Sequence, residues 1–360
     1  MFAKNTLASA VAAAIGVSAV GIAQADSVFF PYAALSTTVT TIVSVINTTS
    51  NNYDQSGIAS TTANLLHYRF YYKSGAAADD LLAPCEEYDE YLPTSKNDIQ
   101  TIDLGGVFGA ETAGVLFNDP SINNKWVASG RDYALGRSVL PARGYLFVDN
   151  SDGVAPVADS GQTLAGEAFI FEFGSGAAWG YQAHDSNDQN YITKASESPS
   201  NVAIMPFTEV TTAFFVTPVD GEQAPDFQNN YRARVEFVTS SRGDMFDRDE
   251  NLISGTLPQD VVCVARVNAA DMLSDGTLAR LGDGGWAKVH NYRVVPNATA
   301  TAWVPAVFDA TNSAVPSASA IRSDWDDGAV VIKLEYNAGA TINGEAVGGT
   351  YNNAIMFAPE

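Results

Sequence analysis

Short runs of alternating apolar and polar residues recur along the whole chain, and this pattern limits the fold more than any other feature. The runs are rich in β-branched and aromatic residues, which favour strands. A period of two places one face of a strand against a core and the other face in water. The clearest runs span residues 38–47, 66–73, 144–148, 167–173, 232–238 and 331–336.

Glycine after Asp or Asn marks tight turns between these runs. Such dipeptides stand at 152–153, 220–221, 275–276, 283–284, 327–328 and 343–344. Past the N-terminal apolar run, a helical period is confined to residues 268–281, where Gly276 weakens it. Many short strands with polar turns predict an all-β fold. We expect an antiparallel β-sandwich architecture with two tandem Ig-like or jelly-roll-like domains.

A faint internal repeat suggests where the two domains meet. Residues 29–32 precede a Thr-rich run, and residues 204–207 precede a similar run at 210–216. Each is followed by an arginine-bearing run and then by an acidic cluster, although the spacings differ. Chance similarity between β-rich segments is the alternative. The repeat predicts domains at 26–196 and 197–360, joined through a polar stretch.

The first 25 residues have the three parts of a secretory signal peptide. Lys4 is followed by an apolar run from Leu7 to Ile22, and Ala23-Gln24-Ala25 is typical of a cleavage site. The run is shorter than the roughly 20 residues that a membrane-spanning helix needs. We therefore expect a mature chain that begins at Asp26 and is secreted or held at the cell surface, without a transmembrane helix.

The chain is strongly acidic, with a formal net charge of −22 at pH 7. Such a surface repels phosphate backbones, so nucleic acid is excluded as a partner. It attracts cations and keeps a secreted protein soluble, and either reason accounts for the charge. We expect the partners to be further copies of the chain, other surface proteins or polysaccharide.

The chain has two cysteines, Cys85 and Cys263. Exported chains meet an oxidising environment, where two thiols allow a single intramolecular pairing. We predict a Cys85–Cys263 disulfide. Two free buried thiols and an intermolecular bridge are the alternatives.

Three groups of acidic residues invite a calcium interpretation, because Ca²⁺ prefers oxygen ligands. The run that starts at Asp247 begins like an EF-hand loop but has Leu252 where the loop needs Gly. Asp and Asn form turns equally well, which is the alternative for every group. The candidate ligands are Asp185, Asn187, Asp188, Asp247, Asp249, Asp324, Asp326 and Asp327. We expect no other cofactor.

Motifs of catalysis are missing from the sequence: there is no G-x-S-x-G, no H-E-x-x-H and no phosphate-binding glycine loop. The three histidines, His67, His184 and His290, suggest no catalytic arrangement. Aromatic residues at 68–72, 88–91 and 179–181 either stack on sugar rings or fill a core. We therefore expect a non-enzymatic protein; a secreted hydrolase is the less favoured alternative.

The function we predict is that of a secreted structural or adhesive protein, such as a fibre or surface-layer subunit. Residues 26–49 form a long β-branched segment that could pair with the sheet edge of a neighbouring subunit. Val39, Thr41, Val43 and Val45 would lie on one face of it. An ordinary strand in the chain's own sheet is the alternative. A carbohydrate- or calcium-binding β-sandwich module is the second functional interpretation.

Overall fold

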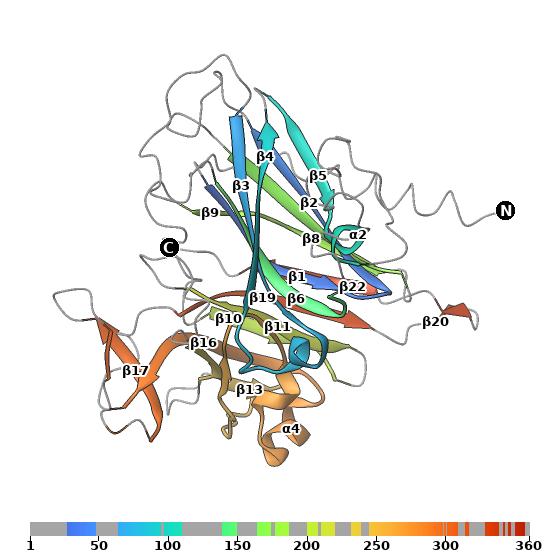
Figure 1. The fold of residues 1–360 in the computed structure, drawn as a ribbon. Coiled ribbons are helices and arrows are strands. Elements are labelled where there is room, and N and C mark those ends of the chain that lie inside the picture. The colour runs from blue at the N-terminus through green and yellow to red at the C-terminus, as the bar shows by residue number, and fades with distance from the viewer. Residues whose placement is uncertain are drawn as a thin grey trace.

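The computed structural model confirms an all-β protein with antiparallel sheets (Figure 1). It describes residues 27–47, 64–94, 97–109, 139–149, 164–173, 177–186, 200–207, 210–219, 232–238, 245–297, 299, 301–308, 314–316, 328–337, 341–342, 345–346 and 350–356. The predicted signal peptide lies outside these residues. Below, residues 27–186 are called the first half and residues 200–356 the second half.

The first half forms two sheets. One has the order β4-β3-β6-β1-β9 and the other the order β5-β2-β7-β8. Their strands are β1 (Ser27–Leu35), β2 (Val39–Asn47), β3 (Asn64–Ser74), β4 (Glu86–Thr94), β5 (Ile99–Asp103), β6 (Ala142–Asp149), β7 (Leu164–Glu172), β8 (Ala177–Gln182) and β9 (His184–Ser186). Side chains from the two sheets meet, as where the Tyr68 hydroxyl donates to Gln100 Oε1 at 2.6 Å.

The second half forms two larger sheets and one small hairpin. A seven-stranded sheet contains the path β14-β12-β16-β17-β18, with β10 and β13 also paired to β16. A four-stranded sheet has the order β15-β11-β19-β22, and β20 pairs with β21. The strands are β10 (Ser200–Ile204), β11 (Thr211–Pro218), β12 (Arg232–Phe237), β13 (Met245–Asp247), β14 (Gln259–Val261), β15 (Ala265–Asn268), β16 (Gly285–Pro296), β17 (Trp303–Phe308), β18 (Ala314–Pro316), β19 (Ala329–Asn337), β20 (Thr341–Ile342), β21 (Glu345–Ala346) and β22 (Thr350–Met356).

Short helices interrupt the strands. They are η1 (Gly75–Asp79), α2 (Leu104–Phe108), η2 (Ala269–Met272) and α4 (Asp275–Leu281). The helical pattern at 268–281 thus corresponds to two pieces, η2 and α4. The turn expected at 275–276 is wrong, because Asp275 and Gly276 begin α4. Helix α2 has no helical period; its N-cap Asp103 accepts a hydrogen bond from Gly106 N, which stabilises the first turn.

The strand pairing of the second half repeats that of the first. In the first half the neighbours run β4-β3-β6-β1 and β5-β2-β7-β8. In the second half they run β14-β12-β16-β10 and β15-β11-β19-β22. The segments matched by the sequence repeat occupy equivalent positions in the two halves for three pairs of strands: β1 and β10, β2 and β11, and β3 and β12. It does not agree for the acidic clusters, since one lies in β4 and the other begins at Asp247, the last residue of β13.

Residues 27–47 form two strands, and both belong to the chain's own sheets. Strand β1 lies between β6 and β9, and β2 lies between β5 and β7. Val43 and Val45 are buried in the core. The buried Thr41 hydroxyl bonds to the backbone of Ala34 at the turn between the strands. Strand β2 is therefore bordered on both sides, and β1 pairs with β6 along its length and with β9 at residues 27–29, so the segment lies in the chain's own sheets, as the alternative interpretation expected.

The buried core is continuous between the halves. Phe215, Ile332 and Leu334 of the β11–β19 pair belong to the same buried cluster as the core of the first half. The alternate residues Phe214 and Val331 pack into the core of the second half instead. This sheet is therefore buried on both faces, and Figure 1 shows it between the blue-green strands and the orange strands. The domain boundary predicted at 196–197 lies outside the described residues.

Candidate functional site

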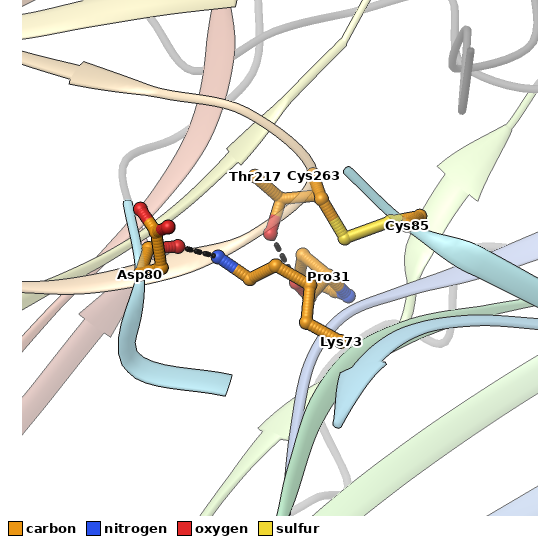
Figure 2. Close-up of a disulfide and its surroundings, with 6 residues drawn as sticks. All are labelled: Pro31, Lys73, Asp80, Cys85, Thr217 and Cys263. Carbon is orange, nitrogen blue, oxygen red and sulfur yellow. Dashed lines mark hydrogen bonds between the residues drawn. A yellow bond between two sulfur atoms is a disulfide. The ribbon is translucent and has the colours of Figure 1, made fainter. Parts of the chain in front are cut away.

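A disulfide joins the two halves beside their shared core (Figure 2). Cys85 precedes β4, and Cys263 lies between β14 and β15. Their Cα atoms are 5.4 Å apart, and the bond is the one predicted from the sequence. Next to it, Val262 N donates to Leu81 O at 2.8 Å. The disulfide and this backbone hydrogen bond thus connect the same two segments, residues 81–85 and 262–263.

Two further polar contacts lie around this disulfide in Figure 2. The Thr217 hydroxyl of β11 donates to the carbonyl of Pro31 in β1, which adds a direct link between the halves. The buried Lys73 ammonium donates to the carbonyl of Asp80. Burial lowers the pKa of Lys73 from 10.5 to about 8, although the nearby Asp80 carboxylate opposes this shift. Lys73 therefore carries a charge at neutral pH at a cost in stability.

A cavity of about 260 Å³ lies at the same junction. The first half lines it with residues of β1, β2, η1, β6, β7 and β8, together with Ser36 and Pro141, and the second half lines it with residues of β11, β15 and β19. The side chains that give it its chemistry are Tyr32, Arg143, Glu172, Trp179, Arg266 and Tyr336. The cavity exists only because the two halves meet, so neither half contains it alone.

Arg143 is held in place at the rim of the cavity. Its Nε and Nη2 donate to Asp79 Oδ1 at 2.9 and 2.7 Å, and its Nη1 donates to the Tyr32 hydroxyl. The Arg143 side chain is 20% exposed and that of Asp79 is 81% exposed, so the pair faces solvent. Burial raises the pKa of Tyr32, while the guanidinium groups of Arg143 and Arg266 oppose this rise. Tyr32 and both arginines line the same cavity.

Aromatic rings form the apolar part of the cavity. Trp179 stacks on Phe215 with ring centroids 5.1 Å apart, and Tyr32 lies 4.3 Å from the same Phe215 ring. The Arg266 guanidinium lies over the Tyr336 ring at 5.1 Å, as in a cation–π contact. The cavity thus combines apolar aromatic residues with two arginines, Arg143 and Arg266, and two acidic residues, Asp79 and Glu172.

The predicted calcium ligands are not brought together in the described part of the chain, where no group of three or more His, Cys, Asp or Glu could hold a metal ion. Asp247 Oδ1 accepts from Asp249 N and Asn251 N, and Asp247 Oδ2 accepts from Arg280 at 2.9 Å. These hydrogen bonds lower the pKa of Asp247, and the bond from the backbone N–H of Asn251 makes the largest contribution. The loop at Asp247 is therefore a turn that its own hydrogen bonds hold together, which is the alternative to the calcium interpretation. Asp185 lies in β9; Asn187, Asp188, Asp324, Asp326 and Asp327 lie outside the described residues.

All three histidines are buried in strands. His67 Nε2 lies 3.1 Å from Asp89 Oδ2, and the His67 ring stacks on Tyr91 at 4.3 Å. The ring of His290 lies 4.8 Å from the ring of Tyr292, measured between the ring centroids.

Of the aromatic residues considered for sugar stacking, Tyr68, Tyr71, Tyr72, Trp179 and Tyr181 are buried in the core. The cavity residues Tyr32, Arg143, Arg266 and Tyr336 were not predicted, since no local pattern connects them.

Comparison with models of protein families, with curated proteins and with solved structures gives no match. The helices of the described part of the chain fall short of the length and apolar character that a membrane crossing needs. The functional argument therefore rests on the residues of this chain.

Proposed function

We propose that the chain is a secreted, non-enzymatic protein with a structural or adhesive role at the cell surface. The observation that carries this proposal is the Cys85–Cys263 disulfide, which joins two halves that already share a core. Disulfides persist in oxidising, extracytoplasmic environments. The signal-like residues 1–25 and the net charge of −22 fit the same environment.

Internal pairing of the buried charged groups supports the non-enzymatic part of the proposal. Arg69 and Asp149 form a buried ion pair between β3 and β6. Lys333 Nζ lies 2.9 Å from Glu335 Oε1, and both side chains are buried. Groups held in this way balance each other's charge within the sheets, whereas catalytic groups need access to a substrate.

Assembly through residues 26–49 is part of the proposal in a restricted form. Because both strands already pair within the chain, β1 with β6 and β2 with β5 and β7, subunits would pair by exchange, with the segment of one copy replacing that of its neighbour. Such swapping keeps every contact and changes only which chain supplies it. We also propose that residues 26–196 and 197–360 are two tandem β-sandwiches of one design, which the repeated strand order supports.

Expression in a secreting bacterial host tests the export and assembly parts separately. The intact mass of the secreted protein should correspond to a chain that begins at Asp26; a mass that includes residues 1–25 contradicts export. Negative-stain microscopy of that protein should show fibres or sheets in at least one ionic condition. Single particles in every condition, at all concentrations tried, contradict the structural role.

A further inference from the structure

We propose that the buried Lys333 forms an amide bond with Asn353, which joins β19 covalently to β22. This inference concerns a modification of the chain itself and does not depend on export or assembly. It starts from a buried ion pair in β19. Lys333 Nζ lies 2.9 Å from Glu335 Oε1, and the two side chains are 2% and 5% exposed. The two residues are separated by one position in the strand, so both lie on the same face of the sheet.

The ion pair lies in an apolar environment. Phe214, which is paired with Lys333 from β11, belongs to the core of the second half. Three donors share Glu335 Oε1, because Met205 N and the Thr212 hydroxyl also bond to it, at 3.2 and 3.4 Å. Two opposite charges are costly to remove from water, and neutral groups of similar volume are often at least as stable in a core. A reaction that removes both charges is therefore favoured here.

The register between β19 and β22 places a carboxamide residue beside this pair. Asn353 is opposite Glu335, and Ile355 is opposite Lys333. Asn353 is thus the diagonal cross-strand neighbour of Lys333 on the same face. Such neighbours are roughly 7–8 Å apart, which a long side chain spans. The register shifts just after this pair, which leaves Asn352 as the extra residue of a bulge.

An amine, a carboxylate and a carboxamide are together sufficient for an intramolecular amide transfer. Glu335 takes a proton from the Lys333 ammonium, and the neutral Nζ attacks Cγ of Asn353. The bond between Nζ and Cγ forms, and the bond between Cγ and Nδ2 breaks. Glu335 passes its proton to the leaving nitrogen, which departs as ammonia, and then takes the second proton that Nζ loses. The products are one amide and one neutral carboxyl group, so the core ends without either charge and no further reactant is needed.

Lys73 shows that burial of a lysine is not by itself sufficient for this reaction. It is 1% exposed, as Lys333 is, but its ammonium donates to the backbone carbonyl of Asp80. The β6 residue opposite Lys73 is Arg143, which carries no carboxamide. Lys73 therefore serves as an internal control for Lys333.

Intact mass and tryptic mapping of the reduced, denatured wild-type protein test the proposal. The mass should be lower than that of the mature sequence by one ammonia molecule. Trypsin cleaves after unmodified lysine, so it should cut after Lys73 but not after Lys333. Residues 323–360 should then form one tryptic peptide, because Arg322 is the preceding site and no Lys or Arg follows Lys333. The full sequence mass, with cleavage after Lys333, overturns the proposal.

Three variants assign the bond to its residues. N353A and E335A should each have the full sequence mass and be cleaved after Lys333, because the first lacks the carboxamide and the second lacks the proton carrier. N352A is the matched control and should still lose ammonia, since Asn352 is the neighbouring bulge residue. Loss of ammonia that N353A retains, or that N352A abolishes, contradicts the assignment.

Circular dichroism checks that each variant is folded. If N353A or E335A does not fold, fragmentation of the wild-type 323–360 peptide by tandem mass spectrometry decides instead. Fragments should place the bond between residues 333 and 353. A bond from Lys333 to any other residue, or no bond, overturns the proposal.

Discussion

Individual buried polar residues in this protein are explained by the partners that the fold gives them. Lys73 is only 1% exposed and reaches the Asp80 carbonyl, and Arg69 reaches Asp149 across the sheet. The Thr40 hydroxyl donates to Asp103 and accepts from Gly105 N, which fastens α2 to β2. A buried polar group without such a partner would cost several kcal/mol. The strands therefore tolerate charged residues where a neighbouring segment completes the hydrogen bonds.

The lowered pKa of Lys73 leads to a pH-dependent prediction. The fall from 10.5 to about 8 corresponds to about 3 kcal/mol of stability that is lost while Lys73 is charged in the folded state. The Lys73→Met variant should be about 2 kcal/mol more stable than the wild type at pH 7, since the lost hydrogen bond costs about 1 kcal/mol. Between pH 8 and 10.5 the unfolded wild type binds more protons than the folded form. The advantage of the variant should therefore shrink across this window.

Urea unfolding of both proteins from pH 7 to 10.5 measures this difference, and other titrating groups cancel in the comparison. A difference in unfolding free energy that is constant over the whole range would contradict the charged, buried state of Lys73.

Phe215 is one of the second-half residues that pack in the core of the first half, and its replacement is a second prediction at this scale. Its ring touches Tyr32 and Trp179 and is 6% exposed. Phe215→Ala should lower the unfolding free energy by about 3–5 kcal/mol, since a large buried ring is removed. Phe173→Ala is the control, because that ring is 41% exposed and should cost less than about 1 kcal/mol. Equal effects of the two variants, measured by thermal or urea unfolding, would contradict the role of Phe215.

At the scale of elements, the first two strands show how a segment that contains a proline is accommodated within the sheets. The pairing of β1 with β6 shifts between Phe30 and Ala33, so Pro31 lies in a bulge and no N–H is needed there. Phe30 packs against β7 at Gly166, where a Cβ would lie only 2.5 Å from the Phe30 ring. A glycine at this position lets the two sheets approach each other. The segment is therefore built into the chain's own core.

Interruption of β2 should unfold the protein. Val43 is 1% exposed between β5 and β7, so Val43→Asp buries an unpaired carboxylate and should cost more than about 4 kcal/mol. Deletion of residues 27–47 should likewise abolish the folded state. Ile99→Asp is the control, because Ile99 is 48% exposed in the adjacent strand. Circular dichroism and melting curves measure both effects. A folded, soluble deletion variant would instead favour a segment that serves a neighbouring subunit.

At the scale of the whole molecule, the two halves share a core, and we expect them to unfold as one cooperative unit. The β11–β19 pair contributes to both cores, and the disulfide closes a loop with a sequence separation of 178 residues beside it. A sheet buried on both faces cannot lose one half without exposing a large apolar surface. This arrangement also creates the cavity whose lining comes from both halves.

Loss of the disulfide should lower stability without dividing the molecule into two transitions. The chain-entropy model gives about 5 kcal/mol as an upper value for a loop of this length. C85S and C263S should each show a fall of this order, and the double variant should show no further loss, because all three remove the same bond. Urea unfolding followed by tryptophan fluorescence and by circular dichroism should give coincident single transitions. Two separate transitions in the wild type would contradict the shared core.

Local chemistry determined the strands and the partner of each cysteine, because alternation and a pair of thiols carry their information within a few residues or by elimination. Of the predicted turns, 283–284 follows α4 as expected, 275–276 is helical, and 152–153, 220–221, 343–344 and Asp327 lie outside the described residues. The sequence alone did not predict α2, whose capping by Asp103 is a contact of one turn without a helical period. Only the tertiary structure decided that β11 and β19 have two buried faces, and that residues 32, 143, 266 and 336 line one cavity. Those residues are separated by more than a hundred positions in most pairs, and it is sheet packing across the whole molecule, which no local pattern encodes, that brings them together.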